Sequence, residues 1–120
     1  MWTPITELEL YDKIQKTESL LQGYLWNFWK LIQIEPEKWQ EEEFGKEGGG
    51  FWVVGICGWR VIWYNDIEDG FNISTYQIYG KIEEYLCNQY ELNDVVYQLY
   101  SFILLGNIVG QSRGGPQNLT

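Results

Sequence analysis

The sequence predicts an α+β domain in which N-terminal helices precede an antiparallel sheet of three or four strands and a C-terminal helix follows it. Two observations carry this prediction. Apolar residues recur at helical spacing toward both ends of the chain. Between them, residues 51–76 are rich in β-branched and aromatic side chains, with glycines where turns are needed. We expect a single domain over residues 1–109 and a disordered polar tail over residues 110–120.

Two helices are expected before the sheet. Thr3 followed by Pro4 is a helix start signal, and apolar residues then recur at helical spacing, which predicts a helix over residues 4–21. Gly23 separates this helix from a second one over residues 24–33. The second helix is apolar on more than one side, so we expect it to be sandwiched between other elements.

The connection from the helices to the sheet carries strong loop signals. Pro36 is expected to end the second helix or to start a short turn that carries Trp39. Three consecutive glutamates, residues 41–43, are followed by the glycine-rich segment 45–50. This composition is typical of an exposed, mobile link.

The centre of the chain predicts a β-hairpin over residues 51–65. Residues 51–57 and 60–65 have the β-branched and aromatic composition of strands, and Gly58-Trp59 between them can form a tight turn. Because side chains alternate between the two faces of a strand, each face of the second strand is expected to have its own chemistry.

The C-terminal half continues the sheet and ends in a helix. Residues 71–78 are expected to be extended, and residues 80–86 are compatible with a fourth strand or with the first turn of a helix. We prefer the strand, because Asn88 and Glu91 form a suitable N-cap and N3 pair for a helix over residues 89–105.

The composition excludes several classes of function. The 120-residue chain has 17 acidic and 8 basic residues, a net charge of −9, which argues against binding to nucleic acids or anionic membranes. The chain lacks histidine, so histidine-dependent triads and histidine-ligated zinc are excluded. Cys57 and Cys87 lie in apolar segments and are expected to be buried, reduced thiols of a cytoplasmic protein, and no secretion signal is recognised. A basic protein partner suits the charge.

The polar run from Asn65 to Gly70 admits two interpretations. One is an Asx-rich turn that caps the hairpin. The alternative is a small-molecule or divalent-metal site, or a hydrolase, that uses the carboxylates of Asp66, Glu68 and Asp69. The run does not match an EF-hand loop, since an isoleucine takes one of its ligand positions. No catalytic residue and no cofactor are assigned, and the identity of any metal stays open.

A third interpretation joins the acidic residues to the aromatic rings around them. At protein interfaces, aromatic side chains anchor the partner and charges steer it. The leading hypothesis is therefore a small, acidic, non-enzymatic interaction or regulatory module, whose partner is another protein or a second copy of the chain. The candidate interaction surface comprises Trp59, Trp63, Tyr64, Asn65, Asp66, Glu68, Asp69, Phe71 and Tyr76.

Three segments resemble a group of small uncharacterised bacterial proteins. They are Pro-Glu-Lys-Trp-Gln at residues 36–40, the glycine-rich start of the hairpin at residues 48–54, and the aromatic–acidic run at residues 63–72. The resemblance extends over roughly residues 24–100. It implies a bacterial, cytoplasmic protein, and it brings no activity and no site residues with it.

Overall fold

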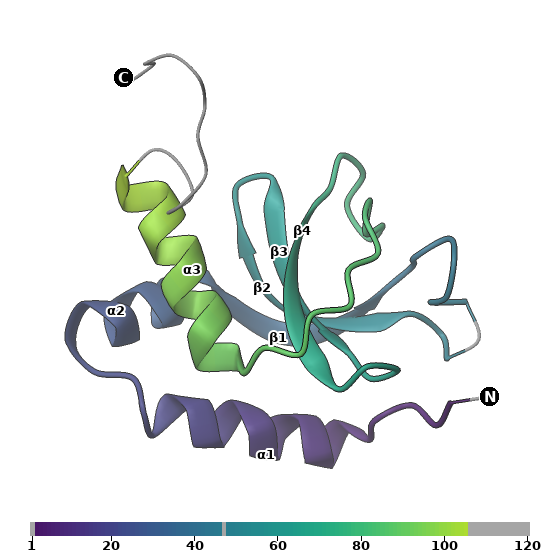
Figure 1. Ribbon diagram of the computed structural model, residues 1–120, viewed down its shortest axis with the longest axis horizontal. Helices are drawn as coiled ribbons and strands as arrows, with labels where there is room; N and C mark the ends of the chain where they lie inside the picture. The colour runs from purple at the N-terminus through teal and green to yellow at the C-terminus, as the bar shows by residue number, and fades with distance from the viewer. Residues whose placement is uncertain (1, 47, 106–120) are drawn as a thin grey trace.

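The computed structural model describes residues 2–46 and 48–105, which form three α-helices and one four-stranded antiparallel sheet (Figure 1). The helices are α1 (Glu7–Glu18), α2 (Gly23–Ile32) and α3 (Leu92–Leu105). The strands are β1 (Gln33–Trp39), β2 (Phe51–Cys57), β3 (Arg60–Asn65) and β4 (Gly70–Thr75), and they pair in chain order. The predicted α+β class, with helices before and after the sheet, is confirmed. The tail predicted over residues 110–120 lies outside the described residues.

Helix α1 begins later than the sequence predicts. The Glu9 N–H donates to Thr6 Oγ1 at 3.1 Å, and the Thr6 N–H donates to Glu9 Oε1 at 3.0 Å. This capping box satisfies N–H groups that the first turn cannot pair internally. The residues before Thr6 do not continue the helix but lie against the sheet, where the ring of Trp2 stacks on that of Phe51.

Helix α2 has its predicted extent, but the expectation that it is sandwiched is wrong. It contacts β2 and α3, and of its residues only Trp29 and Ile32 are buried. Leu31 is 80% exposed. Figure 1 shows α2 at one end of the sheet, beside α3, where no described segment covers its outer side.

Strand β1 is an element that the sequence analysis missed. The sequence predicts that Pro36 ends the second helix or starts a short turn that carries Trp39. In the structure, β1 runs through Pro36 at the edge of the sheet, and its register with β2 shifts between Gln33 and Glu37. An edge strand tolerates proline because only one of its sides needs to pair.

The hairpin of β2 and β3 matches its predicted strands, and its two faces differ as expected. Ile62 and Tyr64 of β3 join the hydrophobic cluster that packs against the helices. Val61 and Trp63 point to the opposite face and join a second cluster, in which Trp39, Phe51, Val53 and Ile82 are also buried. Both faces of the sheet are therefore covered.

The segment after β4 is irregular, so the preferred fourth strand over residues 80–86 is wrong. Within residues 80–86, β pairing is limited to one isolated bridge between Lys81 and Gln40, the residue after β1. The segment nevertheless covers the second face of the sheet, because Ile82 is buried there and neighbouring rings pack beside it. This packing, together with backbone hydrogen bonds from Gln40 to Gly80, from Ile82 to Gln40 and from Glu83 to Thr75, holds the segment in place without a regular ladder.

Helix α3 starts at Leu92, three residues later than predicted, and the expected Asn88–Glu91 cap is wrong. The Asn88 backbone instead pairs with the side chain of Asn72, donating to Oδ1 and accepting from Nδ2, each at 3.1 Å. The Glu91 N–H donates to Asp94 Oδ2 at 3.2 Å, so the N-terminal cap lies three residues further along the chain.

Two further expectations concern membranes and thiols. None of the described helices is long and apolar enough to cross a membrane. Cys57 and Cys87 are both free thiols, but Cys87 is exposed, so the prediction that both are buried is wrong for Cys87. Cys57 is half-buried, and this burial raises the pKa of its thiol.

Candidate functional site

The residues predicted to form an interaction surface divide between the interior and the surface. Of this set, Trp63, Tyr64, Asn65 and Phe71 are buried. They lie on β3 and β4, where the helices cover one face and the segment after β4 covers the other. These four residues therefore cannot contact a partner of the folded chain, and this part of the predicted surface is wrong. Trp59 at the hairpin turn is 70% exposed, and Tyr76 is half-buried.

The polar run after β3 is organised as a turn. Asn65 Oδ1 accepts hydrogen bonds from the N–H groups of Ile67 and Glu68, at 3.0 and 3.2 Å. Its Nδ2 group donates to the Leu86 carbonyl at 2.9 Å. This Asx turn closes the β3–β4 hairpin and ties it to the segment that covers the second face, as the capping interpretation requires.

The three carboxylates of that turn do not converge on one point. Asp66 Oδ2 accepts from the Ile5 N–H at 2.7 Å. Asp69 accepts a hydrogen bond from the Tyr64 hydroxyl, which holds the pKa of its carboxyl below the usual value. Across residues 2–46 and 48–105, no three acidic or thiol side chains gather in a way that could hold a metal ion. The geometry therefore favours the turn over the alternative of a carboxylate site.

Asp66 leads to a prediction about pH. Burial raises the pKa of its carboxyl above the ordinary value, and its Oδ1 is buried without a hydrogen-bond partner among the described residues. The folded chain therefore holds this proton more tightly than the unfolded chain, and the Asp66 contribution to stability falls as pH rises through the folded-state pKa. We expect the stability of Asp66→Asn relative to wild type to increase over that interval, measured by urea unfolding from pH 4 to pH 7. A difference that is constant with pH would contradict this expectation.

Four rings form a row that we call the aromatic ladder: Trp59, Tyr76, Trp39 and Tyr79. The ring centroids of successive members are 6.5, 5.1 and 4.8 Å apart. Trp39 at the end of β1 is buried and supports the two tyrosines from below. Trp59 and Tyr79 are the exposed members, and the Tyr79 side chain is 62% exposed. The ladder thus joins three separate parts of the chain into one row of rings, with an exposed ring at each end.

A carboxylate holds one end of the aromatic ladder. Glu37 Oε1 accepts from the Tyr79 hydroxyl at 2.6 Å and from Trp39 Nε1 at 3.0 Å. The Tyr79 bond, followed by the Trp39 bond, lowers the pKa of Glu37. Glu37 therefore stays ionised at neutral pH and positions both rings, because it accepts from each of them.

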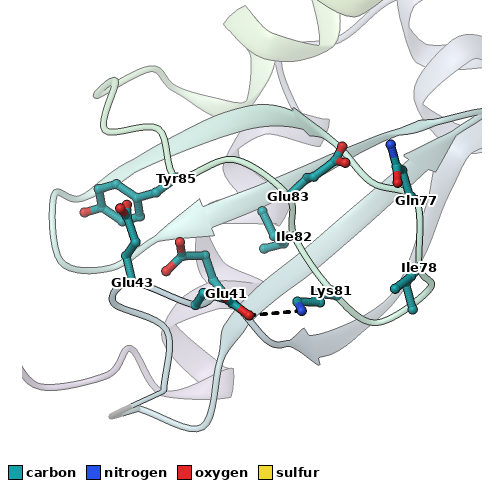
Figure 2. A pocket seen from close by; sticks show the side chains of 9 residues that line it. Glu41, Glu43, Gln77, Ile78, Lys81, Ile82, Glu83 and Tyr85 are labelled. Carbon is teal, nitrogen blue, oxygen red and sulfur yellow. Dashed lines mark hydrogen bonds and ion pairs between the residues drawn. The ribbon is translucent and has the colours of Figure 1, made fainter.

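Next to the ladder lies a groove of about 520 Å³, shown in Figure 2, which we call the acidic groove. Four glutamates and one lysine line it, and Lys81 Nζ is 3.1 Å from Glu42 Oε2. Ile78, which is 65% exposed, lines the groove and directly precedes Tyr79 of the ladder. Tyr79 also lines an adjoining groove together with Glu41, Glu42 and Lys81, so this end of the ladder lies beside the acidic groove. The groove is lined by Glu41, Glu42, Glu43, Gln77, Ile78, Lys81, Ile82, Glu83 and Tyr85.

Glu41 shapes the floor of this groove from a buried position. Only 3% of its surface is exposed, and its Oε1 accepts from the N–H groups of Phe44 and Gly45 at 2.6 and 3.0 Å. The prediction of an exposed link over residues 45–50 is therefore wrong in part. Gly45 and Gly50 are buried, and a Cβ on Gly50 would lie 2.3 Å from the Trp39 carbonyl oxygen.

Sequence reasoning found Trp59 and Tyr76 of this surface but missed Ile78 and Tyr79. A signal was present, because these two large apolar residues directly precede the turn residue Gly80. No local signal places them beside the glutamates that follow β1. The Gln40 N–H donates to the Gly80 carbonyl at 2.9 Å, and this long-range bond brings the two segments together.

Comparisons with protein-family models, with curated proteins and with solved structures find no match to this chain. The fold and the surface together define the class as an acidic α+β protein with an exposed aromatic surface beside a carboxylate-lined groove. The function is therefore argued from the chemistry of that surface.

Proposed function

We propose that this protein is a non-enzymatic interaction module that binds a basic segment of another protein across the aromatic ladder and the acidic groove. One observation carries the proposal: the exposed Tyr79 ring, at one end of the aromatic ladder, lies beside a groove lined by four glutamates and one lysine. Aromatic side chains supply most of the binding energy at many interfaces, and charges next to them select and orient the partner.

The exposure of the rings supports binding to a protein. Trp59, Ile78 and Tyr79 are each more than 60% exposed. Apolar residues scattered singly over a surface need no explanation, whereas a contiguous apolar patch bordered by polar residues is typical of an interaction site. Tryptophan and tyrosine offer large contact areas, and they lose little side-chain entropy when a partner fixes them.

The charges specify the chemistry of the partner. Lys81 pairs with Glu42 and leaves the groove with an excess of negative charge. The whole chain carries a net charge of −9, so it attracts lysine and arginine side chains and repels nucleic acid. The proposal includes a regulatory role in the cytoplasm, which suits a small acidic chain with free cysteines.

Binding to defined peptides tests this function. The purified protein is exposed to an array of peptides that combine lysine and arginine with leucine, phenylalanine or tryptophan, and to a matched array with glutamate in place of the basic residues. We expect binding to the basic array, and we expect Trp59→Ala/Tyr79→Ala to weaken that binding about tenfold or more, as truncation of interface anchors does.

A matched control replaces two exposed rings elsewhere, Tyr24 on α2 and Tyr97 on α3, with alanine. This variant is expected to bind as wild type does. Equal binding to both arrays, or an equal loss in the control variant, would contradict the proposal. Sedimentation velocity tests whether a second copy of the chain covers this surface. A wild-type dimer that is lost in Trp59→Ala/Tyr79→Ala would assign the surface to self-association instead.

A further inference from the structure

A second groove of about 280 Å³ lies on the helix-covered side of the sheet, between β4, the segment after it and α3. We call it the arginine groove. It is separate from the aromatic ladder, because Arg60 shares the face of β3 that carries Ile62 and Tyr64. Its lining includes Arg60, Ile73, Thr75, Glu84, Leu99 and Phe102.

Arg60 holds an unusual position in this groove. Its guanidinium carbon lies 3.9 Å from the centroid of the Phe102 ring, and the side chain is half-buried. Over residues 2–46 and 48–105, it forms neither a side-chain hydrogen bond nor an ion pair within 4.0 Å. Burial lowers the pKa of the guanidinium, as expected for a cation partly withdrawn from water.

A cation that is partly withdrawn from water is stabilised when an anion lies against it. Glu84 lines the same groove and its charge favours the Arg60 cation, but the two form no ion pair within 4.0 Å, and Glu84 Oε1 accepts from the Thr75 N–H at 3.2 Å. The guanidinium lies over the Phe102 ring, and its N–H groups have no hydrogen-bond partner among the described residues. The forked N–H groups of an arginine match the two oxygens of a carboxylate.

The side chains that line the groove indicate which class of ligand it can bind. Ile73, Leu99 and Phe102 offer apolar surface, so the ligand needs an apolar body. Glu84 lines the same groove, so a ligand with a second negative charge, beyond the one that pairs with Arg60, would be repelled. This repulsion disfavours phosphate and other polyanions. The volume suits a small molecule and is too small for a typical drug-sized ligand.

We propose that the arginine groove binds a small organic monocarboxylate, with its carboxylate on the edge of the Arg60 guanidinium and its apolar body against Ile73, Leu99 and Phe102. This site is independent of the proposed protein-binding surface. Trp59→Ala/Tyr79→Ala should leave carboxylate binding unchanged, so either proposal can fail without the other.

NMR titration of the full chain tests the site, with hexanoate, hexylamine and inorganic phosphate as probes. We expect hexanoate alone to produce saturable shifts in the Arg60 Nε–H signal and in the amides of Ile73 and Leu99. Arg60→Met should weaken hexanoate binding about tenfold or more, the loss typical of a hydrogen bond to a charged group. Arg60→Lys keeps the charge but lacks the forked donor, so it should restore the affinity only in part.

The matched control is Lys30→Met, which removes another cation that lies over a ring, 5.0 Å from the Trp26 centroid on α2. It should bind hexanoate as wild type does. The proposal is overturned if hexanoate gives no saturable shift, if hexylamine or phosphate binds as well, or if Arg60→Met and Arg60→Lys both retain full affinity. The wild-type titration decides the first two outcomes without any variant.

Discussion

Replacement of Trp63 with alanine is expected to lower the free energy of unfolding by about 3–5 kcal/mol, the usual cost of truncating a fully buried tryptophan. The indole is completely buried, and the rings of Phe51 and Tyr85 lie 4.8 and 6.1 Å from it. Its Nε1 donates to Ser74 Oγ at 2.9 Å, so truncation leaves both a cavity and a buried hydroxyl without its donor. Domains of this size are stable by about 5–15 kcal/mol, so the change removes a large part of the total.

Urea unfolding followed by far-ultraviolet circular dichroism measures this loss without relying on tryptophan fluorescence. Trp59→Ala is the matched control, because it removes the same ring from an exposed turn and should change stability by no more than about 0.5 kcal/mol. Similar losses in the two variants would contradict the assignment of Trp63 to the interior and Trp59 to the surface.

Replacement of Gly70 with alanine is the second change expected to have a large effect, lowering the free energy of unfolding by about 3 kcal/mol. A Cβ at this position would lie 2.3 Å from the Asn88 carbonyl oxygen and 2.4 Å from the Gln89 Cα. Both neighbours are backbone atoms, so no side chain can rotate away. The Phe71 N–H donates to the Tyr90 carbonyl at 2.9 Å, and relief of the clash must disturb this bond.

Gly58→Ala is the matched control, because it introduces backbone strain without a steric clash. At Gly58 a Cβ would meet no atom within 4 Å, but φ is +61°, so the expected cost is about 1 kcal/mol. Urea unfolding gives both losses, and hydrogen exchange at the Phe71 amide should accelerate in Gly70→Ala more than in Gly58→Ala. A larger loss of stability at Gly58 than at Gly70 would show that the close approach of the two segments is not a tight constraint.

The elements with strong local signals were predictable from the sequence. The hairpin strands follow from β-branched and aromatic runs on either side of a turn glycine, and α3 follows from its apolar stripe. The Asn65 turn was also among the interpretations, because asparagine side chains bond to the backbone two residues further along. In each of these cases the interactions that stabilise the element lie close together in the sequence.

Strand β1 and most of the candidate surface could not be predicted in the same way. Pro36 is a sound signal against a central strand, and only the position of β1 at the sheet edge makes it acceptable. Tyr79 and Glu37 are 42 residues apart in the sequence, yet they share a hydrogen bond. Periodicity and turn signals describe residues that are close together in the sequence, so they do not place Tyr79 beside Glu37. Sequence reasoning therefore selected the rings of the hairpin instead.

The sequence by itself determined the acidic charge, the helices, the central hairpin and the alternation that gives β3 two different faces. The tertiary structure decided which aromatic side chains reach solvent. Alternation separates Tyr64 from Trp63 but cannot show that both faces are covered, one by helices and the other by the segment around Ile82. Exposure depends on what packs above a residue, and that is set by contacts between distant parts of the chain. For this reason Trp59 and Tyr79 are on the surface, while Trp63 is in the core.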